Sequence, residues 1–179
     1  MSEVLAKNLL LTGSPGCGKT TVIRRLVERL ANRRVAGFYT QEIRLEGQRV
    51  GFEVRGLNGG HGILAHVGFQ SSDRVGRYGV DLGAFEQIVR DELIRGRGDV
   101  DAYIIDEVGK MESFSPVFLQ AIAGVLDSPV PVVATIAAKG GGLVGQAKAR
   151  PDVETITVTA ENRDGLPADL ASRLSLRLG

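Results

Sequence analysis

The sequence predicts an α/β fold with a mostly parallel sheet that helices cover on both faces. Short apolar runs alternate with segments whose apolar residues recur at helical spacing, which is the pattern of repeated β-α units. The first run, Leu9–Leu11, leads through a glycine-rich octet into a helical pattern. The 179 residues suffice for one domain with a substantial core, so residues 1–179 are expected to form a single domain.

The octet Gly13 to Thr20 fits the phosphate-binding pattern G-x-x-x-x-G-K-[ST]. Its glycines let the backbone N–H groups of a tight loop approach the charged tail of a nucleotide. Lys19 can reach the β- and γ-phosphates, Thr20 can place its hydroxyl on Mg²⁺, and the positive end of the next helix faces the same anion. The predicted nucleotide-binding residues are therefore Gly13, Ser14, Pro15, Gly16, Cys17, Gly18, Lys19, Thr20 and Thr21.

A helix and an antiparallel meander are expected next. The helix is indicated by apolar residues at helical spacing, namely Val22, Ile23, Leu26, Val27 and Leu30. Three alternating segments separated by turn residues predict a meander inserted between the first and the later β-α units: Gly37–Arg44, Arg49–Leu57 and Gly62–Val67. Residues Gln70–Gly79 are polar and predict an exposed loop. A second helix is indicated by Leu82, Phe85, Ile88, Val89 and Leu93.

The second half of the chain continues the alternation of strands and helices. Ala102–Ile105 predicts a buried strand that stops at Asp106, and Ser115-Pro116 predicts the capped start of a helix. The remaining expected elements are a strand over Val130–Ile136, a short helix after Gly140–Gly142, a strand over Glu154–Thr159 and a closing helix over Leu166–Leu178.

The acidic pair Asp106-Glu107 lies at the end of a predicted parallel strand, where ligands bind in such sheets. In a phosphate-loop enzyme an Asp at this place holds Mg²⁺ opposite the hydroxyl of Thr20. Glu107 points the other way in an extended chain, so it can accept a proton from an attacking water. Glu107 and Lys19 are therefore the predicted catalytic residues, and Thr20 and Asp106 the predicted metal ligands.

Several weaker candidates keep two interpretations each. Thr135 can hydrogen-bond the γ-phosphate or the attacking water, or it is an ordinary strand residue. Asn162 and Arg163 can contact the base, or they form a turn before the last helix. Arg77 can neutralise charge in the transition state, and Lys110 can contact a phosphate or a partner, or both belong to a solvated surface.

The composition excludes several classes of protein. Hydrophobic residues make up 43% and charged residues 24%, and a net charge of +1 offers no overall field for nucleic acid or an anionic membrane. No apolar run of 18 residues occurs, and residues 1–3 lack a basic stretch followed by an apolar one, so we expect neither membrane insertion nor secretion. Cys17 is the only cysteine and cannot form an internal disulfide. We therefore expect a cytoplasmic monomer without a membrane or clear nucleic-acid site.

Six motifs in order resemble one family, the small nucleoside-triphosphatases first described from thermophiles and also called cancer-related nucleoside-triphosphatases. The motifs lie at Gly13–Thr21, Gly37–Arg44, Val75–Val80, Ile105–Glu112, Val133–Ile136 and Glu161–Asp164. The resemblance covers nearly the whole chain, and Asp-Glu-x-Gly-Lys-Met-Glu is its most specific part. It implies a RecA-like P-loop domain with an additional strand between the two phosphate-site strands. It also implies slow, Mg²⁺-dependent hydrolysis of ATP, GTP and other nucleoside triphosphates to diphosphate and phosphate.

Three functions remain open from the residues alone. A hydrolase with broad base tolerance is favoured by Glu107 and by the absence of the Asn-Lys-x-Asp guanine motif. A nucleotide or small-molecule kinase shares this fold and size, with Gln70–Gly79 as a candidate lid. A nucleotide-dependent switch would instead order a loop for a protein or RNA partner. ADP formation that depends on an acceptor would identify a kinase, whereas a hydrolase needs only water.

Overall fold

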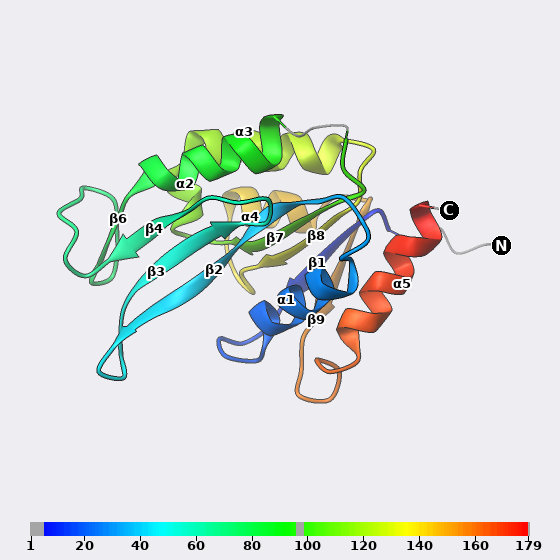
Figure 1. Cartoon of the computed structure of the whole chain (residues 1–179), viewed down its shortest axis with the longest axis horizontal. Coiled ribbons are helices and arrows are strands. Elements are labelled where there is room, and N and C mark those ends of the chain that lie inside the picture. Colours follow the sequence, from blue (N-terminus) through cyan, green and yellow to red (C-terminus); the bar gives the residue numbers. More distant parts are fainter. Residues whose placement is uncertain (1–5, 96–98, 179) are drawn as a thin grey trace.

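The computed structural model describes residues 6–95 and 99–178, and one nine-stranded sheet runs through them (Figure 1). The strand order is β5-β6-β4-β3-β2-β7-β8-β1-β9. One part of the sheet is parallel and consists of β2 (Val35–Leu45), β7 (Ala102–Val108), β8 (Val132–Ile136), β1 (Asn8–Thr12) and β9 (Val153–Thr157). The other part is antiparallel and consists of β3 (Gln48–Gly56), β4 (His61–His66), β6 (Tyr78–Val80) and β5 (Arg74–Val75).

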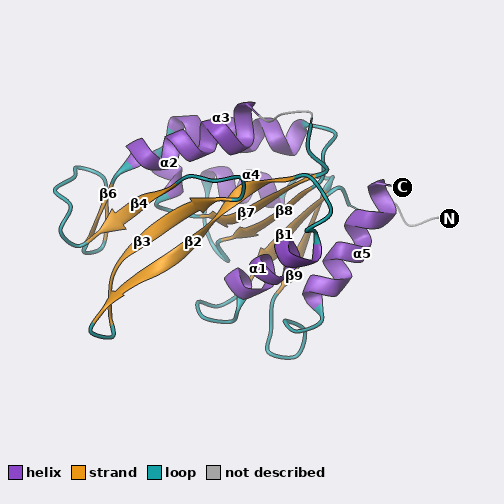
Figure 2. Ribbon diagram, in the orientation of Figure 1, coloured by secondary structure: helices purple, strands orange, loops and turns teal. Residues whose placement is uncertain are grey.

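Helices cover both faces of the sheet, as Figure 2 shows. One face packs against α2 (Leu82–Val89) with its π-helical continuation η1 (Arg90–Arg95), α3 (Pro116–Asp127) and α4 (Gly142–Lys148). The opposite face packs against α1 (Lys19–Arg29) and α5 (Leu166–Leu178). Ser115 caps α3 as expected, since its hydroxyl accepts the N–H of Phe118 at 3.0 Å. The predicted α/β class is confirmed.

Strand β8 lies between β1 and β7, the two strands that lead into the predicted phosphate and acidic motifs. Val133 in β8 pairs with Leu9 on one side and with Ile104 on the other, and all three strands are parallel. This confirms the additional strand that the family resemblance implies. Because the carboxyl ends of parallel strands meet at one edge of the sheet, the segments after β1, β7 and β8 converge there.

Strand β2 joins the two parts of the sheet. Its first residues pair in parallel with β7, and from Phe38 onward it pairs antiparallel with β3, so the predicted meander is confirmed. The two strands approach most closely at Gly37, where φ is 136° and an added Cβ would lie 1.8 Å from the carbonyl oxygen of Ile104. Glycine is therefore required where β2 pairs with β7 at this position. The long β2–β3 arm then extends beyond the body of the molecule (Figure 1).

Glu92 in η1 connects Gly37 of β2 to the turn at Asn58 by hydrogen bonds. Its side chain is buried, and its carboxylate accepts the N–H of Gly37 at 3.0 Å. The same carboxylate accepts the backbone N–H of Asn58 at 2.7 Å and its side-chain amide at 2.8 Å. One buried acidic side chain thus satisfies donors from two separate segments, which fixes the base of the β2–β3 arm.

We expect Glu92→Ala to lower the free energy of unfolding by about 2–4 kcal/mol, because buried donors lose a charged acceptor. Urea denaturation of the purified protein would measure the change as a lower midpoint at unchanged slope. Glu28→Ala is the matched control, since Glu28 is exposed on α1 and the same truncation there should change stability by less than about 0.5 kcal/mol. Equal losses in the two variants would contradict a special role for Glu92.

Two predictions about local structure are wrong. Gln70–Gly79 is not a plain exposed loop, because β5 and β6 form a short hairpin in which Tyr78 is buried against Phe52, with ring centroids 5.3 Å apart. The strand that begins at Ala102 does not stop at Asp106 but continues to Val108. The strand continues because a register shift between Ile105 and Val108 accommodates the acidic pair while β7 stays paired with β8.

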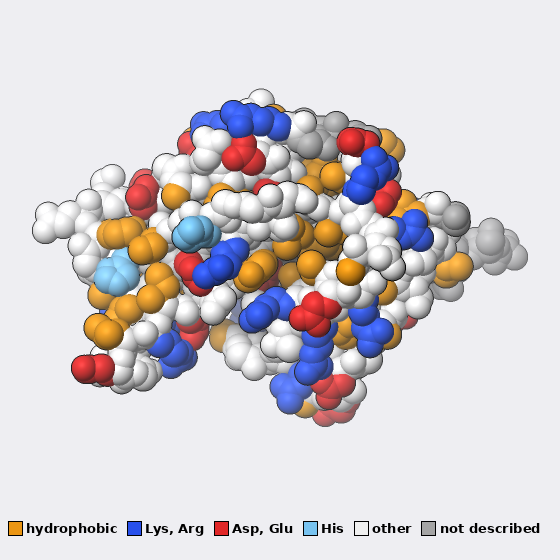
Figure 3. Space-filling view, viewed as in Figure 1, with side chains coloured by type: hydrophobic (Ala, Val, Ile, Leu, Met, Phe, Trp, Pro, Cys, Tyr) orange, Lys and Arg blue, Asp and Glu red, His pale blue; other side chains and the backbone are white. Residues whose placement is uncertain are grey.

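The surface carries charges of both signs. Figure 3 shows acidic and basic side chains interspersed over the face drawn, in keeping with the small net charge. In the part of the chain that the structure describes, no helix combines the length and the apolar character needed to cross a bilayer.

Candidate active site

The phosphate loop connects β1 to α1 at the carboxyl edge of the sheet. Gly18 precedes the helix in a left-handed conformation, with φ of 108°. At Gly13, φ is 151° and an added Cβ would lie 2.8 Å from the sulfur of Cys17 and 2.9 Å from the carbonyl oxygen of Val158. Both positions therefore need glycine for the loop to close in front of the helix. The N-terminus of α1 then directs its free N–H groups toward the loop.

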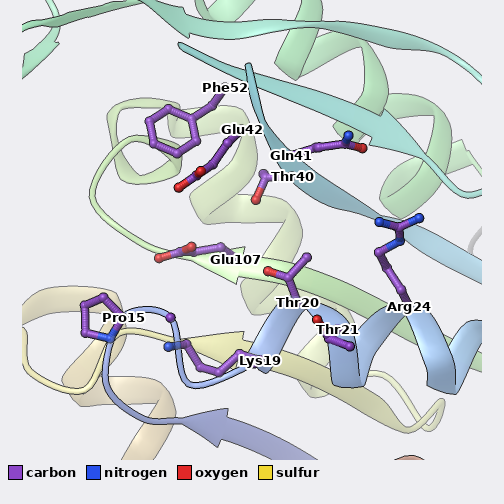
Figure 4. Close-up of a pocket in the computed structure, with 12 residues that line it drawn as sticks. Pro15, Lys19, Thr20, Thr21, Arg24, Thr40, Gln41, Glu42, Phe52 and Glu107 are labelled. Atoms are coloured by element: carbon purple, nitrogen blue, oxygen red, sulfur yellow. The ribbon is translucent and has the colours of Figure 1, made fainter. Parts of the chain in front are cut away.

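Lys19 folds back over its own loop. Its ammonium donates to the carbonyl oxygens of Gly13 at 2.9 Å and of Ser14 at 3.1 Å. These two carbonyls hold the charge at the mouth of the loop, where phosphate oxygens can replace them as partners. The loop borders a cleft of about 440 Å³, which Figure 4 shows from the side. The cleft is lined by Pro15, Gly16, Gly18, Lys19, Thr20, Thr21, Arg24, Thr40, Gln41, Glu42, Phe52 and Glu107.

Asp106 is buried at the base of this cleft, with only 1% of its surface exposed. The hydroxyl of Thr135 donates to its Oδ1 at 2.7 Å, whereas Oδ2 has no hydrogen-bond partner within the described residues. Burial raises the pKa of Asp106 most, and the nearby hydroxyls of Thr135 and Thr20, the backbone of Thr40 and the charge of Lys19 oppose that rise. An unpaired carboxylate oxygen beside a hydroxyl is a donor set that suits Mg²⁺. The predicted pair of Thr20 and Asp106 therefore lies together.

Glu107 projects from β7 into the cleft through a β-bulge. Ile105 pairs with Ala134 and Val108 with Ile136, so β7 fits one extra residue opposite Thr135. The bulge turns Asp106 inward and leaves the Glu107 side chain exposed in the cleft. Figure 4 shows Glu107 between the phosphate loop and strand β2. Asp106 is thus buried, whereas Glu107 lines the cleft.

The surroundings of Glu107 raise the pKa of its carboxyl. Although the residue is exposed in the cleft, the atoms crowded around its carboxyl exclude part of the water and raise its pKa most, the charge of Asp106 raises it further, and Lys19 lowers it. A carboxylate whose pKa is raised accepts a proton more readily than an ordinary surface glutamate. This arrangement suits a group that takes a proton from water beside a nucleotide.

Strands β2 and β3 supply a wall of the cleft that the sequence analysis did not assign to the site. Thr40, Gln41 and Glu42 come from β2 just beyond its parallel pairing with β7, where it pairs with β3, and Phe52 comes from β3. Arg49 and Arg44 hydrogen-bond the carboxylate of Glu42 and lower its pKa, so Glu42 is held ionised. The available signal was the family motif Gly37–Arg44, which contains Thr40 and Glu42 but was not assigned to the site.

Arg24 is a further lining residue that sequence reasoning missed. It lies on α1 one turn after Thr20, and its guanidinium is 5.8 Å from the ring centroid of Tyr39. The stack joins the helix of the phosphate loop to strand β2 across the cleft, at the end away from Glu107 (Figure 4). Its place at helical spacing from Thr20 was the signal that could have identified it.

Arg163 and Asn162 follow β9 and take different positions. The Arg163 side chain packs on the phosphate loop, where its Cδ lies 3.3 Å from the place of a Cβ on Gly18. Together with Thr21 and Arg25 it lines a hollow of about 170 Å³ on the outer side of the loop. The amide of Asn162 is bonded to its own loop, accepting from the N–H of Thr159 and donating to the carbonyl of Thr157, both at 2.8 Å.

The three remaining weaker candidates, Thr135, Lys110 and Arg77, do not come together in the main cleft. The hydroxyl of Thr135 is on Asp106 rather than in the cleft. Lys110 lines a second cavity of about 180 Å³, which shares Thr40, Phe52 and Glu107 with the main cleft. Arg77 is in the β5–β6 turn, where its guanidinium is 5.4 Å from the Tyr78 ring and donates to the Arg49 carbonyl, and it does not line the main cleft.

Comparisons with known proteins all find nucleoside-triphosphatases as relatives. Residues 8–171 match the family model described as NTPase. The nucleoside-triphosphatase THEP1 of Thermofilum pendens is 44% identical over 176 residues, covering 95% of this chain and 96% of that protein. The human cancer-related nucleoside-triphosphatase is 39% identical over 183 residues, covering 94% and 96%. The crystal structure of THEP1 from Aquifex aeolicus aligns with a TM-score of 0.85 at 37% identity, covering 93% and 98%.

Proposed function

Because this chain belongs to the family of THEP1 and cancer-related nucleoside-triphosphatases, we propose that it hydrolyses nucleoside 5′-triphosphates to diphosphate and phosphate, slowly and with Mg²⁺. The observation that carries the proposal is the position of Glu107, which faces the cleft beside the phosphate loop while Asp106 is buried behind it. We further propose that the enzyme works in the cytoplasm as a monomer.

The phosphate loop binds the charged tail of the substrate. Its backbone N–H groups surround the phosphates, and Lys19 exchanges the carbonyls of Gly13 and Ser14 for phosphate oxygens. The ammonium then neutralises negative charge that grows on the bridging oxygen as the bond to the γ-phosphorus breaks. Lys19 is already held at the mouth of the loop, where the phosphates would bind.

Thr20 and Asp106 are the residues that would hold Mg²⁺. The free Oδ2 of Asp106 fits a metal-bound water or the ion, and Thr135 keeps the carboxylate oriented through Oδ1. When bound, the ion would neutralise charge on the β- and γ-phosphate oxygens. The chain itself contributes an oriented buried carboxylate and a hydroxyl at the start of α1.

Glu107 orients the attacking water and takes its proton. The water oxygen forms a bond to the γ-phosphorus, the bond from that phosphorus to the bridging oxygen breaks, and the proton passes to the Glu107 carboxylate. Nucleoside diphosphate leaves with the bridging oxygen, and inorganic phosphate carries the oxygen of the water. The raised pKa of Glu107 matches this task, since a free carboxylate of ordinary basicity would accept the proton less readily.

Base tolerance follows from the few contacts available to the base. Arg163 presents a flat guanidinium beside the loop and can stack on any base, and Asn162 remains our candidate for a polar contact although its amide is bonded within its loop. Stacking does not distinguish purines from pyrimidines by hydrogen bonds. We therefore expect ATP, GTP and other nucleoside triphosphates all to be substrates.

A second candidate function is phosphoryl transfer to an acceptor other than water. It is favoured by the cavity of about 180 Å³ next to Glu107, whose apolar lining includes Leu64, Val75 and Met111. An acceptor held there would approach the γ-phosphate from the same side as water. Such a reaction would form more nucleoside diphosphate than phosphate, so measuring both products separates the two functions.

The test is phosphate release from a panel of nucleoside triphosphates, with Mg²⁺ and with excess chelator, for the wild type and Lys19→Ala. We expect release from several nucleotides, loss of release with chelator, and nucleotide binding weakened roughly 100-fold in Lys19→Ala. Equal diphosphate and phosphate yields would support hydrolysis. No release above the Lys19→Ala background with any nucleotide would contradict the proposed function.

A further inference from the structure

The turn after β7 carries a buried carboxyl that the proposed mechanism does not use. Gly109 follows the strand, and Glu112 opens the short 3₁₀ helix η2 (Glu112–Phe114). Glu112 is only 4% exposed, and with Glu107 it lines the cavity that adjoins the cleft. A buried acidic residue next to a proposed catalytic carboxylate needs a physical explanation.

Both glutamate side chains lie against the α-carbon of Gly109. A Cβ added there would be 2.9 Å from Oε1 and 3.0 Å from Cγ of Glu107, and 3.1 Å from Oε2 of Glu112. A methyl group at this place would therefore collide with the Glu107 carboxyl and crowd the Glu112 carboxyl. Glycine leaves only a hydrogen atom there, which makes room for the two side chains at once.

The backbone does not itself demand glycine at this position. Gly109 is not among the glycines with positive φ, so its conformation is open to any L-residue. The turn is closed by the N–H and hydroxyl of Ser113, which both donate to the carbonyl of Gly109. What an alanine would displace is thus the pair of carboxyls and not the turn.

The direction of Glu107 depends on this packing. Glu112 is the neighbour that meets it across Gly109. Burial and the proximity of Glu107 raise the pKa of Glu112 to about 8, so at neutral pH it is mostly uncharged and does not repel Glu107.

We propose that Gly109 and Glu112 are positioning residues that aim the Glu107 carboxylate at the γ-phosphate side of the cleft. The inference rests on the proposed role of Glu107 and extends it to the turn. Gly109 provides the space, and the buried Glu112 carboxyl forms the wall behind the catalytic group. Neither residue lines the main cleft, so both act through Glu107 and not on the nucleotide.

The first test is Gly109→Ala, which leaves every charged group in place. We expect kcat to fall roughly 10- to 100-fold, because the methyl displaces the Glu107 carboxyl, while KM, nucleotide affinity and Tm stay near wild type. Gly141→Ala is the matched control, since Gly141 has an ordinary φ of −91° and nothing within 4 Å of an added Cβ. It should keep wild-type kcat.

The second test uses Glu112 in case the alanine at 109 disturbs folding. Glu112→Ala removes the wall and should lower kcat at unchanged KM, whereas Glu112→Gln keeps the shape and the neutral character and should restore kcat to within about threefold of wild type. Equal kcat in Glu112→Ala and wild type would overturn the inference for this residue.

A double-mutant cycle with Glu107→Gln separates the inference from the proposed function. If the turn acts through Glu107, then adding Gly109→Ala to Glu107→Gln should change the residual single-turnover rate less than twofold. A full additional loss in that background, or wild-type kcat in Gly109→Ala alone, would overturn the positioning role only. Wild-type turnover in Glu107→Gln itself would overturn the role of Glu107 and the inference together.

Discussion

Glu107→Gln is expected to lower kcat by roughly 10²- to 10⁴-fold while nucleotide binding stays within a few-fold of wild type. The amide keeps the size of the side chain but cannot accept the proton of the attacking water. The phosphate loop and Lys19 are untouched, so the charged tail is still held. Single-turnover phosphate release measures the chemical step, and titration with a fluorescent nucleotide measures the affinity.

The matched control is Glu42→Gln, because Glu42 lines the same cleft but is held differently. Its carboxylate is bonded to Arg49 at 2.9 Å and to Arg44 at 2.7 Å, and these bonds lower its pKa, whereas the pKa of Glu107 is raised. Two carboxylates in one cleft with opposite shifts have different chemistry, and the one with the raised pKa is the better base. A loss in Glu42→Gln as large as in Glu107→Gln would contradict this assignment.

The parallel part of the sheet could be predicted from the sequence because strands buried on both faces carry unbroken apolar runs. Leu9–Leu11 and Val132–Ala134 are such runs, and the structure places them side by side. The phosphate loop could be predicted for a different reason. Its glycines, lysine and threonine are adjacent in sequence, so the geometry that binds phosphate is encoded locally.

The β-bulge at Asp106 and Glu107 could not be predicted, because it arises from pairing with β8. Thr135 lies far along the chain, and only the register between the two strands shows that β7 has an extra residue there. The hairpin formed by β5 and β6 could not be predicted because its strands are too short. Strands of two and three residues are too short to show alternation, and Tyr78 is buried through a contact with Phe52 in another strand.

The β2–β3 wall of the cleft shows the same limit at the site itself. Thr40 and Glu42 belong to a polar, alternating strand, and alternation describes a half-solvated strand equally well inside or outside a site. Their place in the cleft follows from the parallel pairing of β2 with β7, which brings them opposite Glu107. Pairing between distant strands thus determines which side chains join the locally encoded loop.

Asp106→Asn is expected to have opposite effects on activity and on stability. In the metal-free protein it should raise the free energy of unfolding by about 1–2 kcal/mol, because a buried carboxylate with one unpaired oxygen loses its charge. The sign follows from the raised pKa. A buried acid whose pKa is raised holds its proton more tightly in the folded state, so ionisation at neutral pH favours unfolding.

Activity should fall, because the asparagine lacks the charge that would hold Mg²⁺ with Thr20. We expect kcat/KM at millimolar Mg²⁺ to fall roughly 10²- to 10³-fold, and the rise in Tm on adding Mg²⁺ with nucleotide to shrink. Thermal unfolding with and without the metal and nucleotide, alongside phosphate release, measures both effects in one preparation.

Thr135→Val is the control, because its expected effect on the free energy of unfolding has the opposite sign. It removes the donor at 2.7 Å from Oδ1 without changing the charge of Asp106, so it should lower the stability of the metal-free protein by about 1.5–3 kcal/mol. Asp106→Asn should stabilise the same protein, although both variants alter the same pair. If Asp106→Asn instead destabilises the metal-free protein, then the charged carboxylate stabilises the fold. The expectation that burying this charge costs stability would then be wrong.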